Sequence, residues 1–356
     1  MSSARRPIGP DTRVRPRELD DATRQLATLL RAGIPLVQSL QTLSKSQGGE
    51  LGRVLDRVRR DVESGATLEG ALARFPRVFD APYRSLVAAG ELGGLLDTML
   101  ERIASHRERA AKLRGKVRSA LIYPAAVLTI AAGAVGVILA WVVPTFRAMF
   151  DRAGSELPLP TQVVVALSDG LLNWGLWGLL LTILSGLWFA RTMRHSPTLQ
   201  RSTEAGMLRL PLIGRVLADA AAARWCRTLG MLLGAGVPLT DALETVGRVS
   251  GQHRLGDCTG RIRRDTAMGQ RLAPGMARSG CFPAVAVQMV HVGEESGALD
   301  GLLGKAADAL EQSVEQTVGQ MTTLLEPAIM LVLGVVMGGV IIALYLPVFR
   351  LGSAVA

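Results

Sequence analysis

The chain has few of the residues from which metal sites and disulfide-rich domains are built. Only three of its 356 residues are cysteines and four are histidines. Cys226, Cys258 and Cys281 form no CxxC pair, so they predict neither a zinc site nor a disulfide framework, and they agree with a reducing cytosol. We expect all three to be small, buried apolar side chains.

Catalytic signatures are missing as well. The chain contains no HExxH and no GxSxG sequence, and Gly304-Lys305 is followed by Ala306 where a P-loop requires Ser or Thr. The four histidines show no ligand spacing and are expected to be surface or packing residues: His106, His195, His253 and His291. The sequence therefore predicts a protein that is not an enzyme and that holds no cofactor and no metal.

Two stretches lack charged side chains altogether. They run from Pro124 to Pro144 and from Pro327 to Pro347, and in each a Phe follows two residues after the second proline. At ~1.5 Å per residue, such a stretch spans about 30 Å, the hydrocarbon thickness of a bilayer. Both are predicted membrane spans. Because they hold no ionisable group, they offer neither a proton relay nor an ion pathway.

Composition agrees with a membrane protein that has sizeable soluble parts. Hydrophobic residues make up 49% of the chain, aromatic residues only 4%, and the net charge is +10. A basic chain suits either a nucleic acid or an anionic membrane surface. Once spans are present, the membrane surface is favoured, because Lys and Arg flank membrane helices on their cytoplasmic side.

Each of these two spans is the last part of a longer unit that occurs twice in the chain. The sequence RQLATLLRAGIPL at 24–36 returns as RTLGMLLGAGVPL at 227–239, and GELGGLLD at 90–97 returns as GEESGALD at 293–300, both 203 positions later. A shared offset predicts two homologous units, each a soluble domain followed by a membrane helix. The matched residues that we select as structural or interaction sites are Arg24, Gly33, Pro35, Gly90, Glu91, Gly94, Asp97, Tyr123, Pro124 and Pro144, and then Arg227, Gly236, Pro238, Gly293, Glu294, Gly297, Asp300, Glu326, Pro327 and Pro347.

Each soluble domain is predicted to be a compact all-α bundle of about six short helices, with no strand. In the first copy, Gly33 ends one helix and Pro35 precedes the next. A helix over 81–89 is predicted to stop at Gly90. The last helix is predicted to begin near Gly94 and to continue into the first span.

Charge predicts the orientation. Seven basic residues lie between Arg102 and Arg118, whereas the loop at 147–169 is nearly balanced, so the basic side is cytoplasmic and the loop external. A second span at 170–190, with tryptophans at its ends, returns the chain to the cytoplasm. It has no counterpart in the repeat. The residues before the third span are acidic, so charge does not orient that span, and we orient it by its equivalence to the first span in the repeat. Because the two flanks differ in charge, we expect the two domains to contact different neighbours.

The predicted organisation follows from these segments. It comprises a disordered basic tail (1–17), a cytoplasmic helical domain (18–118), a span (120–146), a short external periplasmic loop (147–169), a second span (170–190), a second cytoplasmic domain (191–325), a third span (326–349) and an external C-terminal tail (350–356).

The acidic residues around the repeated glycine turn allow three interpretations. Glu91 with Asp97, and Glu294 with Glu295 and Asp300, offer oxygen atoms that suit a cation such as calcium. They equally suit capping of the following helix at its positive N-terminus, or contact with a partner. Capping is the favoured interpretation.

These repeated blocks, together with KVRSALIYP at 116–124, resemble the F family of inner-membrane platform proteins of type II secretion systems and type IV pili (the GspF/PilC family). The resemblance covers about residues 20–352. LPLIG at 210–214 and the ending YLPVFRLG at 345–352 look closer to the pilus branch.

The resemblance implies a multi-pass protein of the bacterial inner (cytoplasmic) membrane with three spans, a cytoplasmic N-terminus and two cytoplasmic six-helix domains. Implied partners are a hexameric assembly ATPase, pilins or pseudopilins, other inner-membrane components, membrane lipid and further copies in a homo-oligomer, with no direct contact to nucleic acid. Many members carry a further N-terminal segment. A short tail rich in Arg and Pro stands here instead, a departure from the family at the segment that could contact the ATPase.

The implied function is to couple the ATPase to pilin extraction and polymerisation in type IV pilus biogenesis. The alternative is the equivalent platform of a type II protein secretion system. A membrane transporter is a third, weaker alternative, because the spans lack the polar residues that a solute pathway requires.

Overall fold

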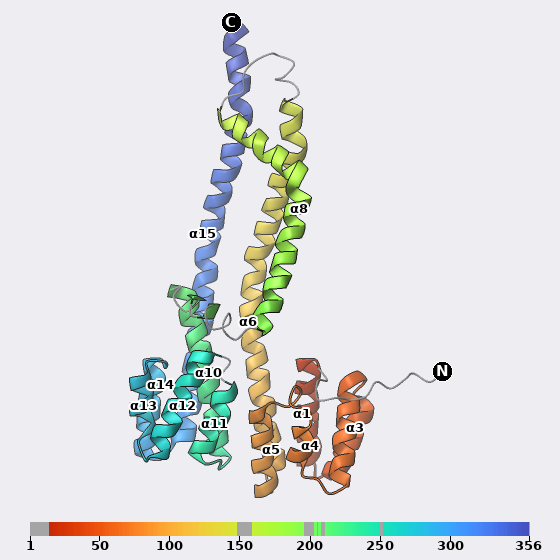
Figure 1. Ribbon diagram of the computed structural model, residues 1–356, viewed down its shortest axis with the longest axis vertical. Coiled ribbons are helices and arrows are strands. Elements are labelled where there is room, and N and C mark those ends of the chain that lie inside the picture. The colour runs from red at the N-terminus through yellow and green to blue at the C-terminus, as the bar shows by residue number, and fades with distance from the viewer. Residues whose placement is uncertain are drawn as a thin grey trace, which may run out of the picture. The chain divides into compact units, whose positions relative to one another are not determined.

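The computed structural model describes residues 14–147, 159–195, 203–204, 206–207, 211–249 and 252–355, and it is helical with no strand among them (Figure 1). The all-α prediction is confirmed. The chain divides into two compact units. Unit 1 comprises residues 1–115 and 206–316, and unit 2 comprises residues 116–205 and 317–356.

Unit 1 holds both copies of the domain that was predicted to be soluble, called the soluble repeats below. The helices of the first repeat are α1 (Pro16–Arg31), α2 (Leu36–Ser46), α3 (Gly49–Glu63), α4 (Leu68–Ala73), α5 (Ala81–Gly93) and the first part of α6 (Leu96–Val137). Those of the second are α10 (Pro211–Gly234), α11 (Leu239–Val249), α12 (His253–Ala267), α13 (Leu272–Ser279), α14 (Ala284–Ser296) and the first part of α15 (Leu299–Val355).

The helix starts reproduce the repeat offset. α11, α14 and α15 begin 203 positions after α2, α5 and α6, whereas α12 and α13 begin 204 positions after α3 and α4. The extra residue therefore falls between the start of α11 and the start of α12, and it is removed again before α14. The predicted duplication thus extends to individual helices.

The predicted apolar stripes form the core of unit 1. On α3, Leu51, Val54, Leu55 and Val58 recur at helical spacing, and each is at most 4% exposed. Burying a side chain of this size stabilises the folded state by roughly 1.5–3 kcal/mol. Buried residues of both repeats belong to one continuous hydrophobic cluster.

The turns follow the glycines and prolines of the sequence, with one correction. Gly33 and Gly236 both adopt φ +80, and Pro35 directly precedes α2, as predicted. The predicted helix end at Gly90 is wrong, because α5 continues to Gly93 and the left-handed residue that ends it is Gly94, with φ +66. Gly90 is a helical residue whose role is in packing.

Near the N-terminus, α1 begins at Pro16, two residues before the helical pattern was predicted to start. A proline is favoured in the first turn of a helix, because an N–H group at that position would have no acceptor within the helix. Residues 1–13 of the predicted tail lie outside the described residues.

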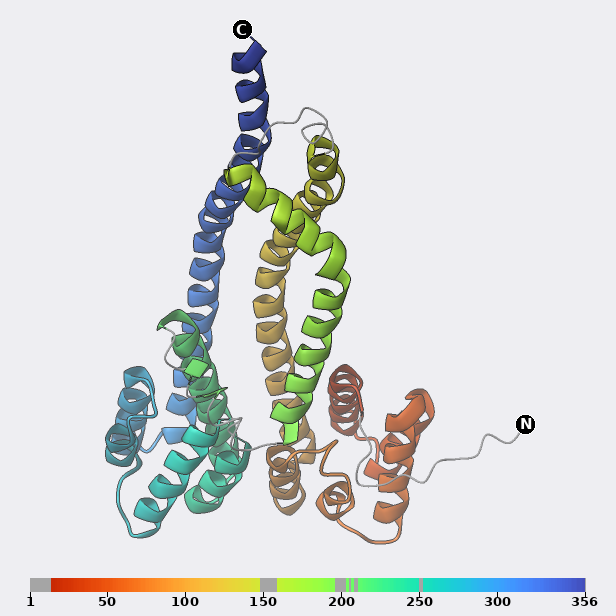
Figure 2. The same ribbon diagram turned by 45° about the horizontal axis from the view of Figure 1, so that its top comes forward.

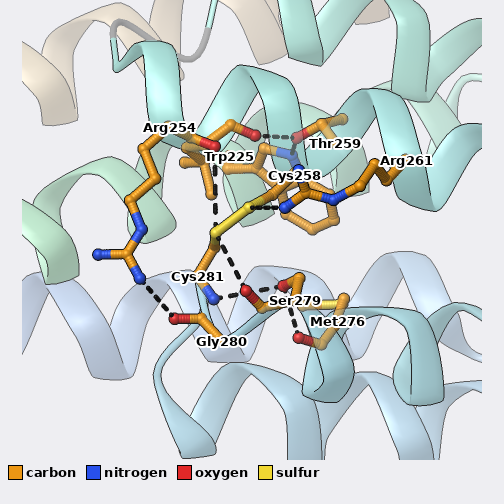
Figure 3. The surroundings of a disulfide bond; sticks show 10 residues. Trp225, Arg254, Cys258, Thr259, Arg261, Met276, Ser279, Gly280 and Cys281 are labelled. Atoms are coloured by element: carbon orange, nitrogen blue, oxygen red, sulfur yellow. Dashed lines mark hydrogen bonds between the residues drawn. A yellow bond between two sulfur atoms is a disulfide. The ribbon is translucent and has the colours of Figure 1, made fainter. Parts of the chain in front are cut away.

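Two cysteines also differ from prediction. Cys258 on α12 and Cys281, which follows α13, form a disulfide with their Cα atoms 6.7 Å apart (Figure 3). The fold brings the turn after α13 over α12, so residues 23 positions apart become neighbours. At the equivalent positions the first repeat has Val54 and Val78, both buried apolar side chains. Cys226 is a free, buried thiol, as predicted.

Unit 2 contains the apolar helices. By length and composition, two helices among the described residues can cross a membrane: Leu96–Arg147 and Leu299–Leu346. The first comprises α6, the π-helical turn η1 (Ile138–Val142) and a short helical continuation. The predicted second span at 170–190 lies within α8 (Leu159–His195), which is not one of the two, so a count of three spans stays a prediction.

The ends of these helices pack together within unit 2. Val143, Val164 and Val340 belong to one small buried cluster that joins α8 to the other two chain segments. The Thr161 hydroxyl donates to the carbonyl oxygen of Ala343 at 2.5 Å. Such bonds matter in an apolar environment, because an unsatisfied polar group there has no water to bind.

The left-handed turn after α5 gives a direct test of the helix boundary. Replacing Gly94 by Ala should lower the stability of the folded chain by about 1–2 kcal/mol, because an L-residue is strained at positive φ. Replacing the adjacent helical Gly93 by Ala should instead stabilise it by about 0.5–1 kcal/mol. Unfolding of the detergent-solubilised variants measures both. Equal effects of the two substitutions would contradict the assigned turn.

Candidate functional site

The repeated GExxG block lies at the joint between α5 and α6, and again between α14 and α15. A Cβ atom on Gly90 would lie 3.0 Å from the Cα of Leu96, and one on Gly293 would lie 3.0 Å from the Cα of Leu299. Such an approach is tighter than nine in ten contacts of real Cβ atoms. The glycine therefore lets the end of one helix cross the start of the next at backbone contact, and Gly94 or Gly297 reverses the chain between them.

The glutamate of the same block caps a helix, but not the one predicted. Glu91 accepts hydrogen bonds from the backbone N–H groups of Leu68 and Glu69, the latter at 2.9 Å, at the start of α4. The prediction that it caps the following helix is wrong, because both carboxylate oxygens point to an earlier helix. A helix start leaves its first N–H groups without intrahelical partners, and a carboxylate satisfies two of them while favouring the positive helix end.

The second repeat preserves this cap. Glu294 accepts from the N–H groups of Leu272 and Ala273, the latter at 3.0 Å, at the start of α13. In the first repeat the Thr67 hydroxyl adds a third bond by accepting from the N–H of Gly70, whereas no side chain caps α13 from Arg271, the residue just before it. The acidic residues in the first turn of the following helices are Asp97 on α6 and Asp300 on α15.

The repeated arginine ties the first helix of each repeat to the last. Arg24 pairs with Glu108 on α6, and its equivalent Arg227 pairs with Glu311 on α15 at 3.1 Å and with Asp308 at 2.6 Å. The Arg24 side chain is 57% exposed and the Arg227 side chain only 10%. An exposed pair contributes at most about 1 kcal/mol, whereas loss of one partner from a buried pair leaves a costly unpaired charge.

Within unit 1 the two repeats meet through α5, which packs against α10 and α11. Arg102 donates to the carbonyl oxygen of Gly234 at 3.0 Å, and Arg109 pairs with Asp308 at 3.2 Å. Both arginines belong to the basic segment that was interpreted as a topology signal. The acidic flank of the second repeat thus meets the basic flank of the first, a contact that sequence reasoning missed although the opposite charges were noticed.

A cavity of about 400 Å³ lies between the repeats and is lined by side chains from both. His106 is one of them, beside Tyr83 of the first repeat and Trp225 of the second. Burial, assisted by the positive charge of Arg227, lowers the pKa of His106 to about 4. His106 is therefore uncharged near neutral pH, and the cavity wall avoids a further positive charge there.

The remaining selected residues belong to unit 2. Tyr123 is exposed and Pro124 lies inside α6, which continues through it without ending. Glu326 and Pro327 are exposed on α15, and Pro144 lies in the short helical stretch after η1. Pro347 also lies within α15. The prolines that bound the predicted spans therefore do not end the helices.

The chain matches a family model described as type II secretion system (T2SS), protein F, twice, over residues 22–144 and 225–347. The two matches coincide with the two copies of the repeat, each consisting of the soluble helices and the apolar helix that follows them.

Three curated relatives cover nearly the whole chain. The type IV pilus assembly protein TapC of Aeromonas hydrophila is 38% identical over 96% of this chain and 83% of its own length. The type IV pilus assembly protein PilC of Pseudomonas aeruginosa is 38% identical over 98% and 93%. The type II secretion system protein F of Xanthomonas campestris is 38% identical over 94% and 82%.

The repeated cap predicts paired losses of stability. Replacing Glu91 or Glu294 by Gln removes one acceptor oxygen and the charge, and should cost about 1–2 kcal/mol each in unfolding of the solubilised chain. Glu295→Gln, at an exposed neighbouring carboxylate, should change stability by less than about 0.5 kcal/mol. If Glu91 and Glu295 variants behaved alike, the carboxylate would not act as a cap.

His106 predicts a pH dependence. Because its pKa is lowered in the folded chain, the unfolded chain binds more protons between about pH 6.5 and pH 4, and stability falls as the pH is lowered through that window. The expected loss approaches about 3 kcal/mol. His106→Gln should remove this part of the acid destabilisation, seen as the difference between the two unfolding profiles. Parallel profiles would contradict a buried neutral histidine.

Proposed function

Since the chain belongs to the family of type II secretion system protein F, we propose that it is an inner-membrane assembly platform for a type IV pilus. In this role it couples a cytoplasmic assembly ATPase to the extraction of pilins from the membrane and their polymerisation. The observation that carries the proposal is the 38% identity to the type IV pilus assembly protein PilC over 98% of this chain and 93% of that relative.

The helices support a role in transmitting motion. α15 runs without interruption from Leu299 to Val355, through Pro327, and α6 runs from Leu96 to Val137, through Pro124. A helix of 57 residues has a length of about 86 Å. Each soluble repeat thus ends in a continuous helix whose later part is apolar enough for a bilayer. In the proposed mechanism, strokes of the ATPase shift the soluble repeats and these helices carry the displacement to pilins.

We further propose the topology that this role requires. Both soluble domains, 18–118 and 191–325, face the cytoplasm, three spans at 120–146, 170–190 and 326–349 cross the membrane, and 147–169 and 350–356 lie outside. The repeated Arg, Gly and Glu residues hold the domains in shape for their partners. The platform is a homo-oligomer that hydrolyses no nucleotide itself and makes no direct contact with nucleic acid.

A second candidate is the equivalent platform of a type II secretion system. The relative from Xanthomonas campestris supports it with the same 38% identity. The mechanism would be unchanged, with pseudopilins in place of pilins.

Affinity purification from the native host in mild detergent, followed by mass spectrometry, tests the choice. Co-purification of a pilus assembly ATPase and a major pilin is expected. Co-purification of a secretion ATPase and pseudopilins would instead support the second candidate function. Capture of neither, together with solute flux through the purified chain, would overturn both.

The coupling mechanism has its own test. Inserting two glycines between Gln316 and Thr317 breaks α15 and should abolish surface pili while leaving membrane insertion and ATPase capture intact. The matched control places the same insertion between Met268 and Gly269, in an exposed turn of unit 1, and should retain pili. Normal piliation with the broken helix would refute the proposed transmission.

A further inference from the structure

The contact between the two repeats is of the head-to-tail kind. α5 of the first repeat packs on α10 and α11 of the second. The equivalent of α5 is α14, and the equivalents of α10 and α11 are α1 and α2. The reciprocal packing of α14 on α1 or α2 is not among the principal helix contacts of the described residues. Figure 1 shows α5 beside α11 and α14 on the other side of the second repeat, and the colours of Figure 2 agree.

A head-to-tail contact between two repeats uses a different surface on each, so the first repeat and the second repeat each keep one surface that the contact does not use. Ala81, Ser85 and Ala88 of α5 line a gap against α11 and are partly covered, whereas their equivalents Ala284, Gln288 and His291 on α14 are exposed. The same α14 face also exposes Val285 and Val292, by 43% and 45%.

The surface of α11 that receives α5 shows the same difference from its equivalent on α2. Glu244 and Thr245 of α11 are partly covered by α5, whereas their equivalents Gln41 and Thr42 on α2 are exposed. The first repeat therefore presents the acceptor surface and the second repeat presents the inserting helix, and the described residues of this chain cover neither.

The side chains on the two free surfaces have changed together. Within the chain, Arg84 of α5 shares one gap with Asp241 and Glu244 of α11. At the equivalent positions Arg84 becomes Val287 on α14, and the two acids become Gln38 and Gln41 on α2. Loss of the cation on one side is matched by loss of the anions on the other. Arg248 lines the same gap and keeps a cationic equivalent, Lys45, which is exposed on α2 and long enough to hold its ammonium group in water.

The donor residue that flanks the contact within the chain has a cationic equivalent. Arg102 on α6 donates to the carbonyl oxygen of Gly234 across the contact between the repeats. Its equivalent on α15 is Lys305, an exposed cationic donor, and the equivalent of Gly234 is Arg31, at the end of α1.

We propose that a second copy of this chain docks here, with α14 of one copy on α2 of the next, repeating between chains the contact that α5 and α11 make within one. Such a heterologous contact does not pair a surface with itself, so it closes a ring of chains or continues as an open row. The proposal refines the homo-oligomer of the proposed function and rests on that part of it alone. It holds whichever fibre is assembled.

Cross-linking between distinguishable copies tests the docking. Full-length chains with different tags, one carrying Thr42→Cys and the other Gln288→Cys, are co-expressed and treated in membranes with a short bis-maleimide. We expect roughly tenfold more mixed adduct than either variant gives with itself, because only the head-to-tail pair places the two thiols together. Adding Val285→Arg to the Gln288→Cys chain should remove the adduct.

The control uses the equivalent pair within one chain. Ser85→Cys with Thr245→Cys occupies the same two positions across the contact between repeats and should cross-link intramolecularly. Absence of the mixed adduct while this control reacts would overturn the proposal, as would failure of the control itself. Self-adducts of the Gln288→Cys chain that exceed the mixed adduct would indicate a two-fold contact and overturn it too. Partner capture, measured separately, distinguishes these results from failure of the proposed function.

Discussion

The carboxylate at the end of α5, and its copy at the end of α14, satisfies a constraint on which the rest of each soluble repeat depends. The N–H groups that open a short helix need acceptors, and α4 obtains two of them from Glu91, which lies on a helix that comes later in the chain. That bond fixes α5 against α4. Gly90 then brings the start of α6 to backbone contact with α5. One block of sequence therefore orders three consecutive helices, and the same block orders α13, α14 and α15.

Comparison of the two repeats distinguishes residues that maintain the fold from residues that form the contact between the repeats. The glycines and the capping glutamates keep their geometry in both repeats, and the first arginine keeps its pairing with the last helix although its exposure differs. The charged flanks do not: Arg109 of the first repeat meets Asp308 of the second, and neither residue has a like-charged equivalent. This ion pair lies at the contact between the repeats, and because both side chains are more than half exposed it contributes little to stability. Part of the divergence of the two copies therefore lies where they contact each other.

Sequence reasoning predicted the parts that depend on neighbours in the chain. The apolar stripe of α3 and the turn at Gly33 follow from residues within one or two helical turns, and both were correct. The end of α5 was misplaced because Gly90 and Gly94 carry the same local signal, and only packing against Leu96 distinguishes them. The Glu91 cap joins residues more than twenty positions apart, and the disulfide joins Cys258 on α12 to Cys281 beyond the end of α13, so no local pattern indicates either.

In the proposed coupling role, the position of the repeated block gives a reason for its recurrence in front of each apolar helix. A helix transmits displacement along its axis only if its first turn is held, because a loose joint would absorb the motion instead. At the start of α6 the joint is held by the close approach at Gly90, by the left-handed turn at Gly94 and by the cap from Glu91. The equivalent residues hold the start of α15. A substitution at this joint is therefore expected to weaken the connection between soluble repeat and apolar helix before it unfolds either one, and this property follows from the placement of three residues.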